Sequence, residues 1–519
     1  MKFAFRRHAR IFSGVKRFDY DVAILGGGSA GYAAARTAAG AGLKTVVIEG
    51  GEEVGGLCIL RGCMPTKALL YAAEVMHLTS HPEPWGIRAG RVGFDFKKVM
   101  ARKNALIKDF ADYRVKQLNA GKFEFIRANG RFVDAHTVEL TSPLPASGTP
   151  LRARRGEEPG EGRSRQITAK NFVIAAGSTI APPPLPPLNE VGFITSDDAL
   201  ALQRLPKSLI VLGGGAIACE FGQFFARFGV KVTLIQRSEH ILKEFDPDAA
   251  AEVEKVFRRE GVQVFTGTKL LDAKRKGKLK AVSFEHGGKM VSVSAEEILF
   301  ALGRVPNTSS LDLENAGVKT ENGRILANEL MQTSMPHIFA GGDCTGPHEI
   351  VHLAVLQGEI AAHNLAAQER GRPARESFAP GASNLKLAGE PSALRSMDYR
   401  LLISVVFTEP QVALVGLTEK EANRQGIPFL TASYPFNDHG KSLIMEAKDG
   451  FVKLLANPKS GEILGGSCVG PVGGELLHEI VVAMAKRMTV HELAAMPHYH
   501  PTLAEIWTYP AEELAEKVR

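Results

Sequence analysis

The chain contains two copies of one folding unit, and this repeat constrains its fold more than any other feature. In the first copy the apolar run YDVAIL at 20–25 leads into GGGSAG, an alanine-rich segment and then KTVVIE. In the second copy SLIVLG at 208–213 leads into GGAIACEFGQFFARFG and then VKVTLIQ. Both copies have the order strand, glycine turn, helix, strand. The repeat therefore predicts an α/β chain with two Rossmann-like dinucleotide-binding domains.

Three residues in the first turn, Gly26, Gly28 and Gly31, have the spacing of a dinucleotide-binding fingerprint. The first glycine permits the tight turn, the second lets the backbone approach a pyrophosphate, and the third lets the helix pack on the strand. Glu49 ends the second strand, where its carboxylate can accept hydrogen bonds from ribose hydroxyls. A glycine-rich turn without a ligand is the alternative, but the flanking strands and the closing acid favour the fingerprint.

The second turn has Gly213, Gly215 and Ala218 at the same spacing, but its second strand ends at Gln236, followed by Arg237. A carboxylate at this strand end would repel a 2′-phosphate, whereas an arginine can pair with one. The second site is therefore predicted to prefer NADPH over NADH. Gln236 can also serve a ribose hydroxyl, and Arg237 can be a solvated turn residue.

Two of the five cysteines lie close together in the stretch GGLCILRGCMPTK. On a regular helix, Cys58 and Cys63 would be separated by about 7.5 Å of rise and about 140° of rotation, which prevents a disulfide. Gly62 and the other glycines of the stretch allow an irregular turn that brings the two sulfurs together. Pro65 fits the early part of a following helix. Cys63 would then lie at a helix N-terminus, where the helix dipole and Lys67 lower the pKa of its thiol.

Three roles are open for this pair of cysteines. A zinc site usually shows a second Cys/His pair at short spacing, and none is evident in the sequence. A structural disulfide across so short a loop would contribute little stability, and five cysteines are too few for a secreted disulfide scaffold. Redox work in a reducing, cytoplasmic environment is the favoured role.

Three more motifs accompany these features: VIAAGS at 173–178, ALGRVPN at 301–307 and HIFAGGDCTG at 337–346. Together with the two fingerprints and the CxxxxC pair, they resemble the flavoprotein pyridine nucleotide–disulfide oxidoreductases of class I. The resemblance covers nearly the whole chain, from about Tyr20 to the C-terminus. It is strongest to dihydrolipoamide dehydrogenases and to mercuric reductase-like proteins.

The resemblance implies a glutathione reductase-like fold with two cofactors. It implies FAD at the first fingerprint, with Gly130, Lys67 and Asp343 as further contacts, of which Asp343 reaches the ribityl chain. It implies NAD(P)H at the second fingerprint, with Gly303 and Arg304 nearby. Hydride would then pass from nicotinamide to flavin, and electrons from flavin to the disulfide.

The resemblance also assigns roles around the cysteine pair. Cys63 would face the flavin as a thiolate, and Cys58 would meet the substrate. Lys67 and Glu220 match the family's ion pair near the flavin and the nicotinamide. A solvated helical lysine and an ordinary helical glutamate are the alternatives for these two residues.

The segment HYHPTLAE near the C-terminus resembles the family's catalytic segment. Thiol–disulfide exchange needs a proton acceptor, because the thiolate is the nucleophile. The resemblance makes His500 the base and Glu505 the carboxylate that orients it, while His498 can be a surface or packing residue. In the family this segment completes the active site of the other subunit, so the resemblance implies a homodimer.

The expected domain order can be given by residue ranges. These are a basic extension at 1–19, an FAD-binding domain at 20–190, an NAD(P)-binding domain at 191–335, a return segment of the FAD domain with a linker at 336–398, and a C-terminal α+β interface domain at 399–519. Irregular, polar composition marks insertions at 142–166 and 368–397. The basic N-terminus can be a plain extension, or a targeting or membrane-surface segment.

The predicted function is an FAD-dependent oxidoreductase that passes electrons from NAD(P)H through Cys58 and Cys63 to a disulfide substrate, reversibly, as dihydrolipoamide dehydrogenases do. A mercuric reductase-like enzyme, a glutathione reductase-like enzyme and a non-enzymatic flavoprotein scaffold are the alternatives. No cysteine follows Cys468, whereas mercuric reductases usually have an extra C-terminal pair. Arg61 departs from the residues commonly found between the cysteines.

The net charge of +7 is not accompanied by a nucleic-acid motif, which argues against nucleic-acid partners. The sequence has no long apolar run, which argues against a membrane span.

Overall fold

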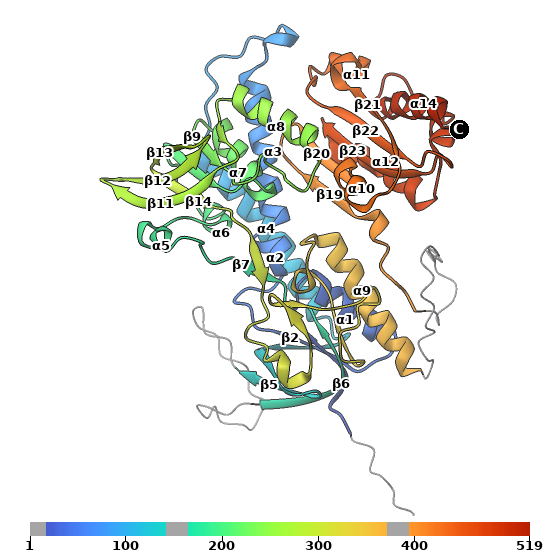
Figure 1. Cartoon of the computed structure of the whole chain (residues 1–519). Helices are drawn as coiled ribbons and strands as arrows, with labels where there is room; N and C mark the ends of the chain where they lie inside the picture. Colours follow the sequence, from blue (N-terminus) through green and yellow to red (C-terminus); the bar gives the residue numbers. More distant parts are fainter. Residues whose placement is uncertain (1–16, 142–164, 371–393, 519) are drawn as a thin grey trace, which may run out of the picture.

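The computed structural model describes residues 17–141, 165–370 and 394–518 (Figure 1). Most of the basic N-terminal segment and most of the two predicted insertions lie outside these described residues. The chain forms three regions: a first α/β region, a second α/β region, and a C-terminal region built on an antiparallel sheet. The long helices α3 and α4 lie at the centre of the molecule, where the regions meet (Figure 1).

The first region contains a parallel sheet in the order β3-β2-β1-β6, and β18 adds to the other edge of β6. The N-terminal half of β6 instead pairs antiparallel with β5, which pairs with β4. Helices α1 and α9 pack together, and with Val22, Val47 and Val173 they form a fully buried core. Strands covered by helices on both faces need such continuous apolar runs. The elements are β1 (Tyr20–Leu25), α1 (Ser29–Gly40), β2 (Thr45–Glu49), α2 (Gly56–Leu60), α3 (Cys63–Ser80), α4 (Phe96–Leu118), β3 (Glu124–Arg127), β4 (Asn129–Asp134), β5 (Thr137–Thr141), β6 (Arg165–Ile174), β7 (Ser178–Ile180), β18 (Ile338–Ala340), the short 3₁₀ helix η3 (Asp343–Thr345) and α9 (Val351–Glu369).

The second region repeats the same topology with a parallel sheet in the order β10-β9-β8-β14. The predicted internal repeat is thereby confirmed. A separate antiparallel sheet, β11-β12-β13, packs beside it, and β15 pairs with β7 of the first region. The elements are α5 (Pro187–Val191), α6 (Ser196–Ala199), β8 (Ser208–Leu212), α7 (Ala216–Arg227), β9 (Lys231–Ile235), α8 (Pro247–Arg259), β10 (Gln263–Phe265), β11 (Lys269–Lys276), β12 (Leu279–His286), β13 (Lys289–Ala295), β14 (Glu297–Phe300) and β15 (Arg304–Pro306).

The C-terminal region is a five-stranded antiparallel sheet in the order β19-β20-β23-β22-β21. Its core includes Trp507, whose indole Nε1–H donates to the Leu476 carbonyl. A buried lysine, Lys453, ties this region to the second one, because its Nζ lies 2.5 Å from Asp248 and 3.4 Å from Asp246. The elements are β19 (Ile403–Val406), β20 (Gln411–Gly416), α10 (Glu419–Gln425), β21 (Leu430–Pro435), η5 (Phe436–Asp438), α11 (Gly440–Ile444), β22 (Phe451–Ala456), β23 (Ile463–Gly470), α12 (Gly473–Ala485), α13 (Val490–Ala494), η6 (Ala504–Trp507) and α14 (Thr508–Lys517).

Helix α1 can approach β1 only because Gly31 has no side chain. A Cβ at this position would lie 1.8 Å from the Gly26 carbonyl oxygen. Gly40, at the exposed end of the same helix, has no atom within 4 Å of its own Cβ position. The two glycines therefore form a matched pair for testing this packing.

We expect Gly31→Ala to reduce the free energy of unfolding by about 1–3 kcal/mol, the usual cost of an overpacked core. Gly40→Ala should change it by no more than about 0.5 kcal/mol, as most surface substitutions do. Denaturant-induced unfolding of both variants would measure the difference. Equal stabilities for the two variants would contradict the close helix–strand contact.

Candidate active site

The first glycine turn has the geometry of an anion-binding cradle. Gly26 has a φ of +109°, and Gly28 precedes the first residue of α1 without any side-chain cap on the helix. The first backbone N–H groups of a twelve-residue helix are therefore available to a phosphate. Gly56 packs against Gly28, where an added Cβ would lie 2.6 Å from the Gly28 Cα. These backbone groups fit a dinucleotide pyrophosphate.

Glu49 lies at the end of β2, directly beside this turn. Its two carboxylate oxygens accept hydrogen bonds from the N–H groups of Gly27, at 2.7 Å, and Gly51, at 2.6 Å. The backbone thus holds the carboxylate at the strand end and leaves further lone pairs for ribose hydroxyls. Gly130 on β4 lies close by, since its Cβ position is 3.2 Å from Leu25 and 3.5 Å from Ile48. The structure therefore brings the predicted Glu49 and Gly130 to the same edge of the sheet.

The cysteine pair spans a break between two helices. Helix α2 ends at Leu60 and α3 begins at Cys63, so Cys63 lies at a helix N-terminus, as the sequence predicts. Gly62 allows the chain to fold back, because a Cβ there would lie 2.9 Å from the Leu57 carbonyl oxygen and 3.2 Å from the Cys58 Cα. Both thiols are free in the structure, and in this form the pair corresponds to the reduced state of the predicted disulfide.

The two thiols differ in acidity. Cys58 donates a hydrogen bond to Cys63, and this bond lowers the pKa of Cys63 while it raises the pKa of Cys58. Burial opposes the shift at Cys63 and adds to the shift at Cys58. The positive charge of Lys67 lowers the pKa of Cys63 further, and the negative charge of Glu220 raises it. Of the two thiols, Cys63 is therefore the more acidic.

Lys67 and Glu220 form an ion pair between the first and second regions. Lys67 on α3 donates from Nζ to both carboxylate oxygens of Glu220 on α7, each at 2.9 Å. The Phe407 N–H, from the loop between β19 and β20, donates to the same carboxylate at 2.9 Å. The Lys67 ammonium also lies 4.5 Å from the centre of the Phe407 ring. One buried carboxylate therefore joins all three regions.

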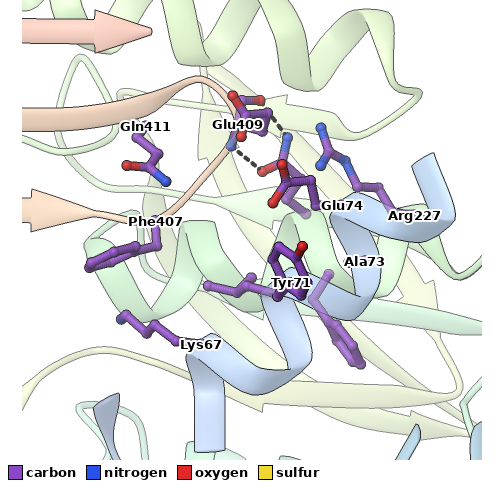
Figure 2. Close-up of a pocket in the computed structure, with 11 residues that line it drawn as sticks. Lys67, Tyr71, Ala73, Glu74, Arg227, Phe407, Glu409 and Gln411 are labelled. Atoms are coloured by element: carbon purple, nitrogen blue, oxygen red, sulfur yellow. Dashed lines mark hydrogen bonds between the residues drawn. The ribbon is translucent and has the colours of Figure 1, made fainter. Parts of the chain in front are cut away.

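A cavity of about 190 Å³ lies next to this ion pair (Figure 2). Lys67 and Tyr71 reach it from α3, while Phe407 and Glu409 reach it from the C-terminal region (Figure 2). The Glu409 N–H donates to Gln223 Oε1 and its carbonyl accepts from Gln223 Nε2, both at 2.7 Å. Burial raises the pKa of the Glu409 carboxyl to about 7. The two hydrogen bonds between the Gln223 side chain and the Glu409 backbone are a second link between α7 and the C-terminal region.

Asp343 and Arg304 lie on one hydrogen-bonded chain. Ser178 Oγ donates to Asp343 Oδ2 at 2.7 Å, and Arg304 Nε donates to Ser178 Oγ at 2.8 Å. Arg304 also donates to the Ser178 carbonyl at 2.8 Å. The structure thus places Arg304 with Asp343, a predicted FAD contact, although the resemblance places it at the NAD(P) site. Gly303, immediately before it, has a φ of +116° and nothing near its Cβ position.

The second glycine turn has the same backbone shape as the first. Gly213 has a φ of +115°, Gly215 precedes α7 without a side-chain cap, and Ala218 is buried in the helix. Gln236 packs on Gly214 at the end of β9, and its side-chain oxygen accepts from the Arg237 N–H at 3.1 Å. The Arg237 side chain is exposed at this strand end. The turn therefore fits a second dinucleotide.

His500 and Glu505 form the predicted pair at the C-terminus. His500 Nδ1 lies 3.1 Å and 3.0 Å from the two Glu505 oxygens, and the His500 side chain is 77% exposed. Within the described residues, no hydrogen bond joins His500 to either thiol of the same chain. His498 packs differently: its side chain is largely buried, and Nε2 lies 2.6 Å from Glu479.

Two contacts of this site were not predicted from the sequence. One is the hydrogen bond from the Phe407 N–H to Glu220. Any residue has a backbone N–H, so the residue type at this position could not predict the contact. The other is His439, whose Nε2 lies 3.4 Å from Glu505 Oε1. His439 stands in the stretch PFNDHGKS, far from Glu505 in the chain, where no spacing pattern marks it.

Comparisons with known proteins match most of the chain to one family. The family profile described as pyridine nucleotide-disulphide oxidoreductase matches residues 20–358, and the profile of its dimerisation domain matches residues 402–511. A dihydrolipoyl dehydrogenase of Bacillus subtilis is 35% identical, over 94% of this chain and 96% of the relative. A mercuric reductase of Staphylococcus aureus is 30% identical, over 94% of this chain and 81% of the relative.

A solved structure shows the same likeness in three dimensions. The HOCl-induced flavoprotein disulfide reductase RclA from Escherichia coli, as a Cu(II) complex, superposes with a TM-score of 0.78 at 25% identity. The match covers 95% of this chain and 99% of that chain. In the part of the chain that the structure describes, no helix has the length and apolar character needed to cross a membrane.

The charges around Cys63 predict opposite effects of two neighbouring substitutions. In the reduced protein, the pKa of Cys63 is lowered to about 7, so its thiolate should predominate above neutral pH and be lost as the pH falls through about 7. Lys67→Gln removes a positive charge and should raise the pKa of Cys63. Glu220→Gln removes a negative charge and should lower it. Ultraviolet thiolate absorption, measured against pH with Cys63→Ser as the baseline, would show both shifts. Shifts of the same sign would contradict this electrostatic account.

Proposed function

The chain belongs to the pyridine nucleotide-disulphide oxidoreductases, and we propose that Cys58 and Cys63 are its redox-active pair, with His500 of the partner subunit as their base. The chain is accordingly a flavoprotein disulfide oxidoreductase with a C-terminal dimerisation domain. One observation supports the assignment above all others. Cys63 begins α3 with a lowered pKa, next to a Cys58 thiol with a raised one.

The family is FAD-dependent and takes electrons from NAD(P)H. When bound, FAD supplies the transfer of two electrons between the nicotinamide and the dithiol–disulfide pair. The turn at Gly26 to Gly31 and the carboxylate of Glu49 would hold its pyrophosphate and ribose. Asp343, oriented by Ser178, would hold the ribityl hydroxyls, and Lys67 would lie close to the flavin ring.

The dithiol can reduce a substrate disulfide in two exchange steps. The Cys58 thiol first gives its proton to His500, and the Cys58 thiolate attacks one sulfur of the substrate disulfide, which forms a mixed disulfide. His500 returns the proton to the thiolate that leaves. The Cys63 thiolate then attacks Cys58 Sγ, which forms the Cys58–Cys63 disulfide and releases the second substrate thiolate. The exchange consumes the two electrons of the dithiol, so NAD(P)H must restore them in each turnover.

We assign a lipoyl-type small disulfide, or the corresponding dithiol in reverse, as the substrate class. Several relatives at 34–35% identity over nearly the full length are named dihydrolipoyl dehydrogenases, which supports this class. The relative named mercuric reductase supports mercuric ion as the second candidate. The Arg61 side chain is 44% exposed, and its Nη2 lies 2.9 Å from Glu53. It would contribute a charged group to the substrate entrance.

Initial rates with lipoamide, glutathione disulfide and mercuric ion, each with NADH and NADPH, would test the substrate class. Lipoamide should give the highest kcat/KM. Cys58→Ser should reduce that rate at least about 10³-fold, because the attacking sulfur is lost, and His500→Gln should reduce it about 10²-fold or more, the usual contribution of a general base. A Cys58→Ser variant with unchanged turnover would exclude the proposed pair.

We further propose that NADPH is the preferred nicotinamide. The neutral Gln236 and the exposed Arg237 at the end of β9 support this preference, since neither would repel a 2′-phosphate. Glu49 occupies the corresponding strand end of the first site, where it would repel such a phosphate.

Gln236→Glu should lower kcat/KM for NADPH relative to NADH by about tenfold, because the new carboxylate faces the 2′-phosphate at close range. Arg237→Ala should shift the ratio in the same direction. The measurement is kcat/KM for both nucleotides in the wild type and both variants. A wild type that already prefers NADH, or a ratio that neither substitution moves, would contradict the assignment.

A further inference from the structure

A second histidine lies behind the carboxylate that orients the proposed base. His439 follows η5 and precedes α11, and its side chain is fully buried. Its Nδ1 lies 2.8 Å from Ser442 Oγ, which is also fully buried. Its Nε2 lies 3.4 Å from Glu505 Oε1. The Glu505 carboxylate therefore lies between two imidazoles, with the exposed ring of His500 on one side and the buried ring of His439 on the other.

The surroundings of His439 favour its neutral form. Burial lowers the pKa of His439, the nearby His500 lowers it further, and the Glu505 carboxylate opposes both effects. Two aromatic rings lie edge-on to the His439 imidazole. The distance between ring centres is 6.4 Å for Tyr509 and 6.5 Å for Phe436. A neutral imidazole carries one proton, so its tautomer decides what it can offer to Glu505.

The carboxylate oxygen beside Nε2 selects the tautomer of His439. A proton on Nδ1 would leave the Nε2 lone pair facing a carboxylate oxygen, which is repulsive. A proton on Nε2 faces that oxygen favourably, and the Ser442 hydroxyl can then donate to Nδ1. Nε2 is buried and has no hydrogen bond of standard geometry among the described residues, so Glu505 Oε1 is the acceptor it faces. A small closing movement of the 3.4 Å gap completes the bond.

We propose that His439 is a positioning residue that donates from Nε2 to Glu505 and thereby fixes the carboxylate that orients His500. The inference rests on the proposed function, because it requires His500 to be the base of the exchange. His500 is exposed and its ring has only Glu505 to set its orientation among the described contacts. When His439 holds the Glu505 carboxylate, that carboxylate keeps the His500 Nδ1–H in place. The Nε2 atom of His500 is then left free for the thiol.

Two amide substitutions separate the donor function from simple packing. In His439→Gln, the side-chain nitrogen can occupy the place of the histidine Nε2 and donate to Glu505. In His439→Asn, the shorter amide can reach only the place of Nδ1, so the contact with Ser442 is kept and the donor to Glu505 is lost. Both changes leave a smaller polar side chain in the same pocket, so they form a matched pair.

The experiment uses the full-length flavin-loaded protein and two assays. Reduction of the disulfide substrate by NAD(P)H requires the thiols and the base. Reduction of ferricyanide by NAD(P)H takes electrons directly from the flavin and bypasses both the thiols and the base.

We expect His439→Asn to lose about tenfold in kcat for the disulfide, a part of the usual contribution of a positioned base. His439→Gln should stay within about threefold of the wild type, and ferricyanide rates should be unchanged in both variants.

His500→Gln serves as the reference for the underlying function. If His500→Gln keeps full disulfide turnover, the proposed base is wrong and the role of His439 falls with it. A second outcome is that His500→Gln lowers disulfide turnover while His439→Gln and His439→Asn lower it equally, or leave it unchanged. The proposed base then stands, and the inference on His439 is wrong.

Ser442→Ala provides a second test in case His439→Asn does not fold. It removes the hydroxyl that contacts Nδ1 and leaves both histidines and Glu505 in place. We expect a loss of about threefold in disulfide turnover with an unchanged ferricyanide rate, because the His439 ring then loses the contact that holds its Nε2 toward Glu505. Unchanged disulfide turnover in Ser442→Ala would contradict the positioning role of His439.

Discussion

The carboxylate of Glu220 holds the three regions of this chain in one arrangement. It lies on a helix of the second region, receives the ammonium of Lys67 from the first, and receives the Phe407 N–H from the C-terminal region. Its side chain is only 4% exposed, so the charge is stable there because both oxygens are hydrogen-bonded. A change at this carboxylate therefore affects the relative placement of the two dinucleotide sites as well as the local charge.

The same ion pair sets the chemistry of the cysteine pair. Lys67 lies one helical turn after Cys63, so its charge stabilises a thiolate at the helix start, where the helix dipole acts in the same direction. The negative charge of Glu220 opposes this effect by raising the pKa of Cys63. Cys58 lies within the preceding short helix α2, and its thiol donates to Cys63, which raises the pKa of Cys58. The hydrogen bond between the two sulfurs and the charge of Lys67 therefore give the two thiols different acidities.

Short-range features of this fold could be predicted from the sequence, and long-range ones could not. The strand–turn–helix units follow from apolar runs and glycine spacing within about 30 residues, and the start of α3 at Cys63 follows from the neighbouring glycine and proline. The contact of Phe407 with Glu220 involves a backbone group, which any residue supplies. Arg304 was expected at the nicotinamide site but hydrogen-bonds Ser178 beside Asp343, because β15 pairs with β7 across the two regions. Only the folded chain shows which strands meet.

The exposure of His500 explains why its support has to come from the interior. The proposed base for a sulfur on another subunit would have to project from its own domain, and most of the His500 ring is free of the chain that carries it. Such a ring cannot be oriented by packing. Its orientation must come from one carboxylate, and that carboxylate can be rigid only if buried groups hold it. Glu505 is buried on η6 and lies 3.4 Å from Nε2 of the buried His439. The His439 ring lies in turn beside Tyr509, which stacks on Tyr434. The exposed His500 ring can therefore extend toward a partner subunit, while the buried His439 ring holds the Glu505 carboxylate that both of them contact.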